Sequence, residues 1–555
     1  MVYSKLSIDA GGRRIDQSLN QPQPLTPTKA SPRVSKSGLI LGLLILTVVV
    51  VFLSLIPKPE NDLFFELRIG ADILSSGHLP HFDTYSWTNR GIRWDVPEWL
   101  SFVIYAAAYR QCGFFGVWLV MVSMTVLTVW TVWLTLAPRL GFAWAFQLTN
   151  LMALALSDYI QERPYVYTYL FLALSLSKIT KAREGRLRLL LWLIPICAVW
   201  TNLHQGVLVL VCILAAYTVG DLMALALRKP NFANEREQGD ARRRALWMAA
   251  STVACALAAM ASPYGWRVYW NVYITLRDRT MMSNVTEWNS IAVVPPAQIA
   301  AFLMIALLTL AAVIASRKLS IADALVLGAL FVESMLHARN TALFAVAAVI
   351  VARPHFEAVV DRLRRYLGES SGVARNAAIG FVGVLYLIAV CAVGVASLKP
   401  AIGPQGYSVE GIGEAVARVP SYPSGAVDFV RSSGLPSNMR VFNNFSIGGY
   451  LMWTLPSQPD FVDGRLDVFA GRTFDDMLVI DHGHGSPAWV DLVRTYDLDC
   501  VITTSRSVAT AFAGQPDWAV VYADEPRKHH SRCVVLLRRR PKFASVIAKS
   551  GSIKI

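Results

Sequence analysis

The sequence predicts a polytopic α-helical membrane protein with an α/β domain at its C-terminal end. Of its 555 residues, 54% are hydrophobic and 16% are charged, a composition too apolar for a soluble chain of this size. Apolar stretches divide residues 38–398, and Lys and Arg gather in short clusters between them. After residue 399, short apolar segments alternate with helical stretches, which is typical of a small α/β domain.

Residues 1–37 form a polar segment rich in Pro, Ser and Gln, and this composition predicts a disordered cytoplasmic tail. The apolar run 39–56 follows it without a small-residue cleavage site. We therefore expect a signal anchor that is retained as the first membrane helix.

The apolar stretches are 39–56, 99–112, 114–137, 142–158, 165–180, 189–201, 206–227, 245–262, 297–315, 321–336, 340–352 and 376–398. If all of them are spans, the basic clusters at 178–188 and 228–244 fall outside, against the positive-inside tendency. Segment 99–112 is short for a span and carries Arg110, so we expect it to lie as a helix on the outer membrane surface. The other eleven form a transmembrane domain over 38–398 in the plasma (inner) membrane.

With eleven spans the N-terminus lies in the cytoplasm, the α/β domain at 399–540 lies outside it, and 541–555 is a terminal tail. The strands and helices of this domain are expected in RVFNN, GGYLMWTL, DFVDGR, PAWVDLVRTY, DCVITT, WAVVYAD and CVVLLRRR. Cys500 and Cys533 lie here, where an oxidising compartment allows either a disulfide or two buried thiols. The net charge of +14 reflects topology, and no nucleic-acid partner is expected.

The polar junctions between spans all fall on the outer side in this topology. They are the first extracytoplasmic loop 58–113 and the segments 161–164, 201–206, 262–288 and 337–340. Ionisable groups near membrane depth are expensive and are usually retained for a function. We therefore expect them to surround one extracytoplasmic cavity.

An ordered series of short motifs runs through these junctions. It comprises Asp62-Leu63-Phe64-Phe65-Glu66-Leu67, Trp94-Asp95-Val96-Pro97-Glu98-Trp99-Leu100, Arg163-Pro164, Asn202-Leu203-His204-Gln205-Gly206, Ser262-Pro263-Tyr264-Gly265, Glu287-Trp288 and Asp463-Gly464-Arg465. The series resembles the GT-C superfamily of membrane glycosyltransferases, and most closely a group of poorly characterised bacterial members with a D-L-W-W-H-L first loop. Glu66 and Pro97 stand where that group has histidines.

The resemblance implies transfer of a sugar from a polyprenyl-phosphate donor to an extracytoplasmic glycan, lipid or protein acceptor. In the superfamily an Asp just after the first span is the usual catalytic residue, and Asp62 occupies that place. Glycosyl transfer needs a carboxylate that deprotonates the acceptor hydroxyl, so Asp62 is the candidate base. The alternative is that Asp62 only caps the helix that follows it.

Glu66 lies one helical turn after Asp62, and the two carboxylates form the candidate catalytic pair. Together they could hold a divalent cation that bridges the phosphates, so the cofactor is undetermined. Alternatively, Glu66 pairs with Arg68 or with a lipid headgroup.

The substrate-binding candidates are drawn from the other motifs. Arg163 and Arg339 offer guanidinium forks suited to phosphate, although salt bridges to neighbouring glutamates are an equal alternative. Glu98 could bind a sugar hydroxyl beside the Trp94 ring, or Trp94 is an interfacial anchor. His204 is either an acid or a histidine satisfied by backbone carbonyls. The set is completed by Tyr264, Glu287, Asp463 and Arg465.

We therefore expect a membrane glycosyltransferase. Two rivals stay open at this point: a transporter or flippase of lipid-linked glycans, and a glycan-assembly partner that keeps the fold without the chemistry. A transporter is expected to show internal repeats and midplane breaks, whereas the polar residues here gather at one membrane face.

Overall fold

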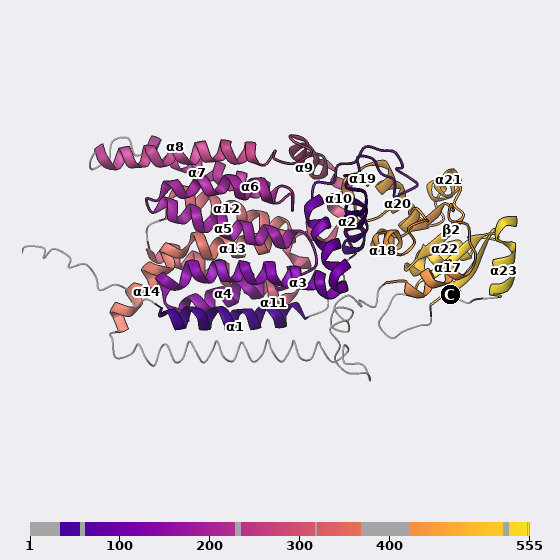
Figure 1. Cartoon of the computed structure of the whole chain (residues 1–555), viewed down its shortest axis with the longest axis horizontal. Helices are drawn as coiled ribbons and strands as arrows, with labels where there is room; N and C mark the ends of the chain where they lie inside the picture. Colours follow the sequence, from indigo (N-terminus) through magenta and orange to yellow (C-terminus); the bar gives the residue numbers. More distant parts are fainter. Residues whose placement is uncertain are drawn as a thin grey trace, which may run out of the picture.

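A computed structural model describes residues 34–55, 61–227, 235–316, 319–367, 422–524, 532–551 and 553. Figure 1 shows a bundle of long helices at one end and a smaller region that contains a sheet at the other. The predicted span 376–398, almost all of the predicted tail 1–37 and the start of the predicted α/β domain lie outside the described residues.

The bundle is built from apolar helices that lie roughly along one another (Figure 1). They are α1 (Lys36–Ser54), α3 (Trp99–Leu140), α4 (Phe142–Leu156), α5 (Tyr165–Arg183), α6 (Leu193–Trp200), α7 (Val207–Leu227), α8 (Glu235–Ala258), α11 (Pro296–Ser316), α12 (Ile321–Leu336) and α13 (Thr341–Val351). Helix α14 (Arg353–Leu367), which is rich in Arg, follows α13. Every residue of α13 is buried, which explains why this helix is apolar on all sides.

Four of the described helices are long and apolar enough to cross a membrane, namely α1, α3, α7 and α11. A fifth results if residues 338–351 and 353–366, which meet at 53°, form one bent span. Other predicted spans are shorter helices in the structure, such as α4 with 15 residues and α13 with 11. The count of eleven stays a prediction.

The segment predicted to lie on the membrane surface is helical and is separated from the rest of α3 by a kink. Cys112 (φ −137°, ψ 18°) and Gly113 (φ 60°, ψ −151°) interrupt the helical backbone. The part before the kink packs on α2 (Leu63–Ser76) so closely that a Cβ on Gly70 would lie 2.1 Å from the Phe102 carbonyl oxygen. The first predicted loop therefore contains two helices packed against each other.

The described C-terminal region holds a four-stranded sheet in the order β1-β2-β4-β3, with β1 parallel to β2 and the other pairs antiparallel. The strands are β1 (Val441–Asn443), β2 (Cys500–Thr503), β3 (Trp518–Ala523) and β4 (Val534–Arg538). The helices are α17 (Ser424–Ser432), α18 (Phe445–Thr454), α19 (Leu466–Phe469), α20 (Arg472–His482), α21 (Pro487–Thr495), α22 (Arg506–Ala513) and α23 (Ala544–Ser550).

Cys500 and Cys533 are free, buried thiols, so the alternative of a disulfide is wrong. Cys500 faces Leu537 across the β2–β4 ladder, whereas Cys533 precedes Val534, which faces Thr503 at the other end. Four residues of extended chain, about 13 Å, therefore separate the two positions.

The loop between α2 and α3 is fastened to the C-terminal region along most of its length. The Trp87 indole donates to the Val441 carbonyl at 2.9 Å, and the Thr88 hydroxyl donates to the Phe461 carbonyl at 2.6 Å. The Asn89 amide donates to the Val468 carbonyl at 2.7 Å. Residues 77–98, called the first loop below, are thus shaped by residues more than 350 positions later in the chain.

Candidate functional site

Asp62 stands at the N-cap position of α2, but its side chain makes no capping hydrogen bond. The carboxylate instead accepts from Nη2 of Arg163, which lies just before α5. The other terminal nitrogen of Arg163 donates to Glu287, in the short 3-10 helix Thr286–Trp288. One guanidinium thus joins two carboxylates from distant segments. Asp62 therefore stands at the N-cap position without capping α2 through its side chain.

Arg339 supplies a second guanidinium beside this group. It lies in the 3-10 helix Ala338–Asn340, 4.5 Å from the centroid of the Trp288 ring. Among the described residues, no carboxylate oxygen lies within 4 Å of it. The side chains of Asp62, Arg163 and Glu287 are 16%, 21% and 27% exposed, so solvent reaches the cluster.

The two carboxylates on Arg163 differ in their pKa. Burial raises the pKa of Asp62, and Glu287 and Asp463 add to this effect against the opposing charge of Arg163. Burial also acts on Glu287, but Arg163 and Arg339 outweigh it and hold its pKa below the ordinary value. Asp62 is therefore the member of the pair that takes up a proton more readily.

Glu98 and His204 form a second, adjacent pair. The Nδ1 atom of His204 accepts from the Gly206 backbone N–H at 2.9 Å and lies 2.7 Å from Thr168 Oγ1, which in turn accepts from the Trp200 indole. With Nδ1 occupied as an acceptor, the proton of the neutral ring lies on Nε2, 3.5 Å from Glu98 Oε1.

Burial shifts the protonation of this pair toward the neutral forms. It lowers the pKa of His204 well below its ordinary value, and Arg339 and Arg163 lower it further. It raises the pKa of Glu98 to about 7, partly offset by the Gln205 backbone N–H. Glu98 can therefore exchange a proton near neutral pH beside the Asp62 cluster.

Three further candidates, Glu66, Trp94 and Tyr264, are more deeply enclosed. Glu66 is 2% exposed, and the neighbouring Arg68 donates to Asp72 at 3.0 Å. Trp94 is 4% exposed and donates to Asp467 at 3.0 Å. Tyr264 is buried with its ring 6.4 Å from that of His81, and burial raises its pKa to about 12. These side chains face protein, not a solvent-exposed surface.

Asp463 and Arg465 lie in a buried network with Asp83 of the first loop. Arg465 donates from Nε and Nη2 to Asp463 at 2.6–2.9 Å and from Nη1 to Asp83 at 2.8 Å. Its guanidinium also lies 4.7 Å from the Trp94 ring centroid. The side chain is 1% exposed, so its donors are directed at protein carboxylates.

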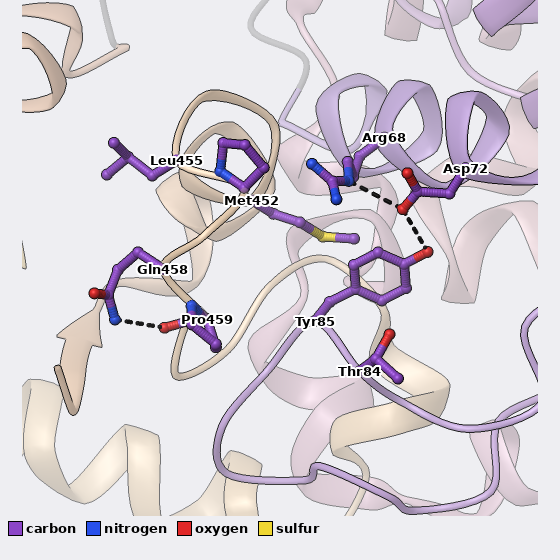
Figure 2. Close-up of a pocket in the computed structure, with 9 residues that line it drawn as sticks. Arg68, Asp72, Thr84, Tyr85, Met452, Leu455, Gln458 and Pro459 are labelled. Atoms are coloured by element: carbon purple, nitrogen blue, oxygen red, sulfur yellow. Dashed lines mark hydrogen bonds and ion pairs between the residues drawn. The ribbon is translucent and has the colours of Figure 1, made fainter. Parts of the chain in front are cut away.

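A small pocket opens between α2, the first loop and the end of α18 (Figure 2). Arg68 and Asp72 reach into it from α2, and the Tyr85 hydroxyl donates to Asp72 at 3.0 Å. Along a helix Arg68 lies about 9 Å beyond Asp62. The pocket therefore adjoins the site without containing the candidate catalytic carboxylates.

The described residues include no group of three or more His, Cys, Asp or Glu side chains arranged to hold a metal ion. Asp62, one of the two predicted cation ligands, is engaged by Arg163. That contact uses Oδ2 of Asp62, and a divalent cation at Asp62 and Glu66 stays a prediction.

Several residues of the site were not predicted. Thr168 lies within the apolar α5, where no spacing distinguishes it. Asp83 is one of many polar residues of the first loop, and its partner Arg465 is 382 positions away. Trp288 and Gly464 belong to short motifs in the sequence, but neither was predicted as a site residue. The structure places Trp288 beside Arg339 and Gly464 beside Asp62.

The sequence matches no family model and no curated protein. A solved structure of the Archaeoglobus fulgidus oligosaccharyltransferase, tethered with an acceptor peptide containing the NVT sequon, aligns with a TM-score of 0.51 at 12% identity, over 84% of this chain and 69% of that one. Its apo form aligns with the same score and coverage at 11% identity. The chain has the GT-C fold.

ArnT from Cupriavidus metallidurans, bound to undecaprenyl phosphate, aligns over 92% of this chain and 99% of that one, with a TM-score of 0.47 at 15% identity. The predicted GT-C resemblance is confirmed at the level of the fold by the oligosaccharyltransferase alignments. The resemblance to members with a D-L-W-W-H-L loop stays a prediction.

Proposed function

We propose that this chain is a membrane glycosyltransferase that moves a sugar from a polyprenyl-phosphate donor to a glycan, lipid or protein acceptor on the extracytoplasmic side of the plasma membrane. The observation that carries the proposal is the solvent-reached cluster of Asp62, Arg163, Glu287 and Arg339 at one end of a GT-C bundle. It combines a carboxylate of raised pKa with two guanidinium groups.

The reaction is a single displacement at the anomeric carbon of the donor sugar. Asp62 accepts the proton of the acceptor hydroxyl while the acceptor oxygen bonds to that carbon. The bond from the carbon to the phosphate oxygen breaks, and the electron pair leaves with the phosphate. Arg163 and Arg339 stabilise the negative charge that gathers on the leaving phosphate.

The net charge of the cluster is consistent with this displacement reaction. Arg163 and Arg339 together carry +2, and ionised Asp62 and Glu287 carry −2, so these four groups sum to zero. When Asp62 takes the proton the sum becomes +1. The phosphate gains one negative charge in the same step, so proton uptake and charge development compensate each other within the site.

Glu98 and His204 are proposed to bind the sugar or relay a proton beside this cluster. His204 Nε2–H faces Glu98, and the pKa of Glu98 is near 7. The fold likeness to an oligosaccharyltransferase supports a transferase class, and the donor and acceptor are proposals that follow from the resemblance in sequence.

The test is complementation of a deletion strain by Asp62→Asn and Glu66→Gln, with glycans and glycolipids profiled by mass spectrometry. Asp72→Asn is the matched control, because Asp72 lies on the same helix and pairs with Arg68 away from the cluster. We expect Asp62→Asn to lose one glycan species at normal expression and Asp72→Asn to keep it. Full rescue by Asp62→Asn would contradict the assigned base and favour a transport or scaffold role.

A further inference from the structure

The Asp463-Gly464-Arg465 segment touches the carboxylate of Asp62. A Cβ added to Gly464 would lie 2.1 Å from Asp62 Oδ1, 2.7 Å from Cε1 of Phe65 and 3.0 Å from Asp62 Cγ. The backbone of Gly464 thus forms one side of the site. Any other residue would place a Cβ atom where Gly464 has only a hydrogen.

Both neighbours of Gly464 are held firmly. Arg465 makes three hydrogen bonds to Asp463 and one to Asp83, and all three side chains are at most 1% exposed. The Arg465 backbone N–H also donates to Asp463 at 2.9 Å. Because charge-assisted, bidentate contacts of this kind are directional, the segment has little freedom to retreat from Asp62.

We propose that Gly464 is a positioning residue: its segment, anchored through Arg465 to Asp83, confines the Asp62 carboxylate on one side and keeps it against Arg163. The inference rests on the proposed function, in which Asp62 is the base. It assigns the C-terminal region a part in the reaction through the position of the Asp62 carboxylate.

The atoms near Gly464 decide what a methyl group would displace. The three nearest belong to side chains, and of these two are in Asp62, whose carboxylate can rotate. The third is in Phe65, a buried ring packed at 5.9 Å from Phe102. Gly448 differs, because a Cβ there would lie 2.0 Å from the Val462 carbonyl oxygen and 2.7 Å from the Asp463 Cα. Gly464→Ala should therefore move Asp62, whereas Gly448→Ala should strain the backbone.

The experiment compares Gly464→Ala with Gly514→Ala, a C-terminal glycine whose Cβ would meet its nearest neighbour at 3.5 Å. Product formation is measured in membranes of the deletion strain, which contain the native donor and acceptor, across a pH series. Binding of undecaprenyl phosphate and the Tm of the full-length protein are measured alongside. We expect Gly464→Ala to reduce product by roughly 10–100-fold, with probe binding kept and a smaller fall in Tm than Gly448→Ala.

The pH profile separates positioning from a merely structural role. Four charged groups from different segments act on Asp62: Arg163 and Arg339 lower its pKa, and Glu287 and Asp463 raise it. To clear the methyl beside Oδ1 the carboxylate must rotate, and this rotation takes Oδ2 away from Arg163, which is the largest lowering influence. The acidic limb of the Gly464→Ala profile should therefore move to higher pH, while Gly514→Ala keeps the wild-type profile.

The outcomes distinguish the two proposals. If Asp62→Asn loses the product while Gly464→Ala keeps wild-type product and an unmoved acidic limb, the positioning role is overturned and the proposed function is kept. Full product with Asp62→Asn would overturn both. If Gly464→Ala fails to fold, Asp83→Asn loosens the same anchor without adding an atom beside Asp62, and an unmoved acidic limb in that variant would overturn the inference.

Discussion

Glu98 and His204 show how burial sets the chemistry of single side chains in this protein. Glu98 is 21% exposed and keeps a proton up to a pKa of about 7, while His204 stays neutral with its Nε2–H toward Glu98. A neutral imidazole beside a protonated carboxyl presents hydrogen-bond donors at a site that also holds two guanidinium groups. Such a site favours ligands rich in oxygen, as sugars and phosphates are.

Glu98→Gln should change the pH dependence of stability. The folded-state pKa of Glu98, about 7, lies above that of an unfolded glutamate, about 4.3. Between these values the folded state binds more protons, so the contribution of Glu98 to stability is present below the lower pKa and is lost as pH rises through 7. Wild type loses this contribution between about pH 5 and pH 7, whereas Gln does not titrate. The Tm of Glu98→Gln should therefore rise relative to that of wild type over this range and then stay constant relative to it. A constant difference would contradict the shifted pKa.

Gly206→Ala should destabilise the protein by about 1–3 kcal/mol through overpacking. A Cβ at this position would lie 2.2 Å from Thr168 Oγ1, which holds the imidazole, and 2.7 Å from Nδ1 of the His204 ring itself. Gly328→Ala is the control, because no atom lies within 4 Å of its added Cβ. Thermal unfolding of both variants in detergent measures the effect, and equal Tm values would show that the Thr168–His204 contact yields easily.

At the scale of elements, the break in α3 has a backbone cause. Gly113 adopts φ 60° and ψ −151°, a conformation open almost only to glycine. The break allows the first part of α3 to turn onto α2, so that α2 presents Asp62 near Arg163. Charge distribution and length predicted a helix on the outer membrane surface for the preceding segment, but they did not predict its packing against α2.

Gly113→Ala should therefore cost about 1–3 kcal/mol, because a Cβ strains this conformation even though no other atom is near it. Cys112→Ala is the matched control, since Cys112 is exposed and its φ of −137° suits any residue. The free energy of unfolding in detergent is the measurement. A Gly113→Ala protein as stable as Cys112→Ala would mean that the break relaxes at little cost.

Some of the elements follow from local pattern and others from distant contacts. The apolar runs predicted the bundle helices, because their signal lies within each segment. Segment GGYLMWTL lies in helix α18, and its two glycines pack against the Val462 carbonyl oxygen and the Asn61 carbonyl oxygen. Likewise, Asp62 and Arg163 were predicted as site residues, but their contact spans 101 positions, and no spacing in the sequence indicates it.

At the scale of the whole molecule, the two regions meet through the first loop. The loop is bound to the C-terminal region by hydrogen bonds of Trp87, Thr88 and Asn89 and by the ion pair of Asp83. On either side of the loop, α3 packs within the bundle and α2 packs on α3. The C-terminal region thus shapes the loop that carries Glu98 and lies against Asp62. This arrangement argues against a C-terminal region that serves only to recruit a substrate.

Asp83→Asn tests how strongly this junction contributes to the stability of the molecule. Asp83 is fully buried and accepts from Arg465 at 2.8 Å, so neutralising it weakens a buried, charge-assisted hydrogen bond and should cost about 1.5–3 kcal/mol. Asp428→Asn is the control, because Asp428 is 76% exposed, lies 3.8 Å from Arg431 and should contribute about 0–1 kcal/mol. Unfolding in detergent gives the free energies, and limited proteolysis reports on the first loop. We expect faster cleavage within residues 77–98 in Asp83→Asn alone. Equal cleavage in both variants would mean that the side-chain hydrogen bonds of Trp87, Thr88 and Asn89 hold the junction without the buried ion pair.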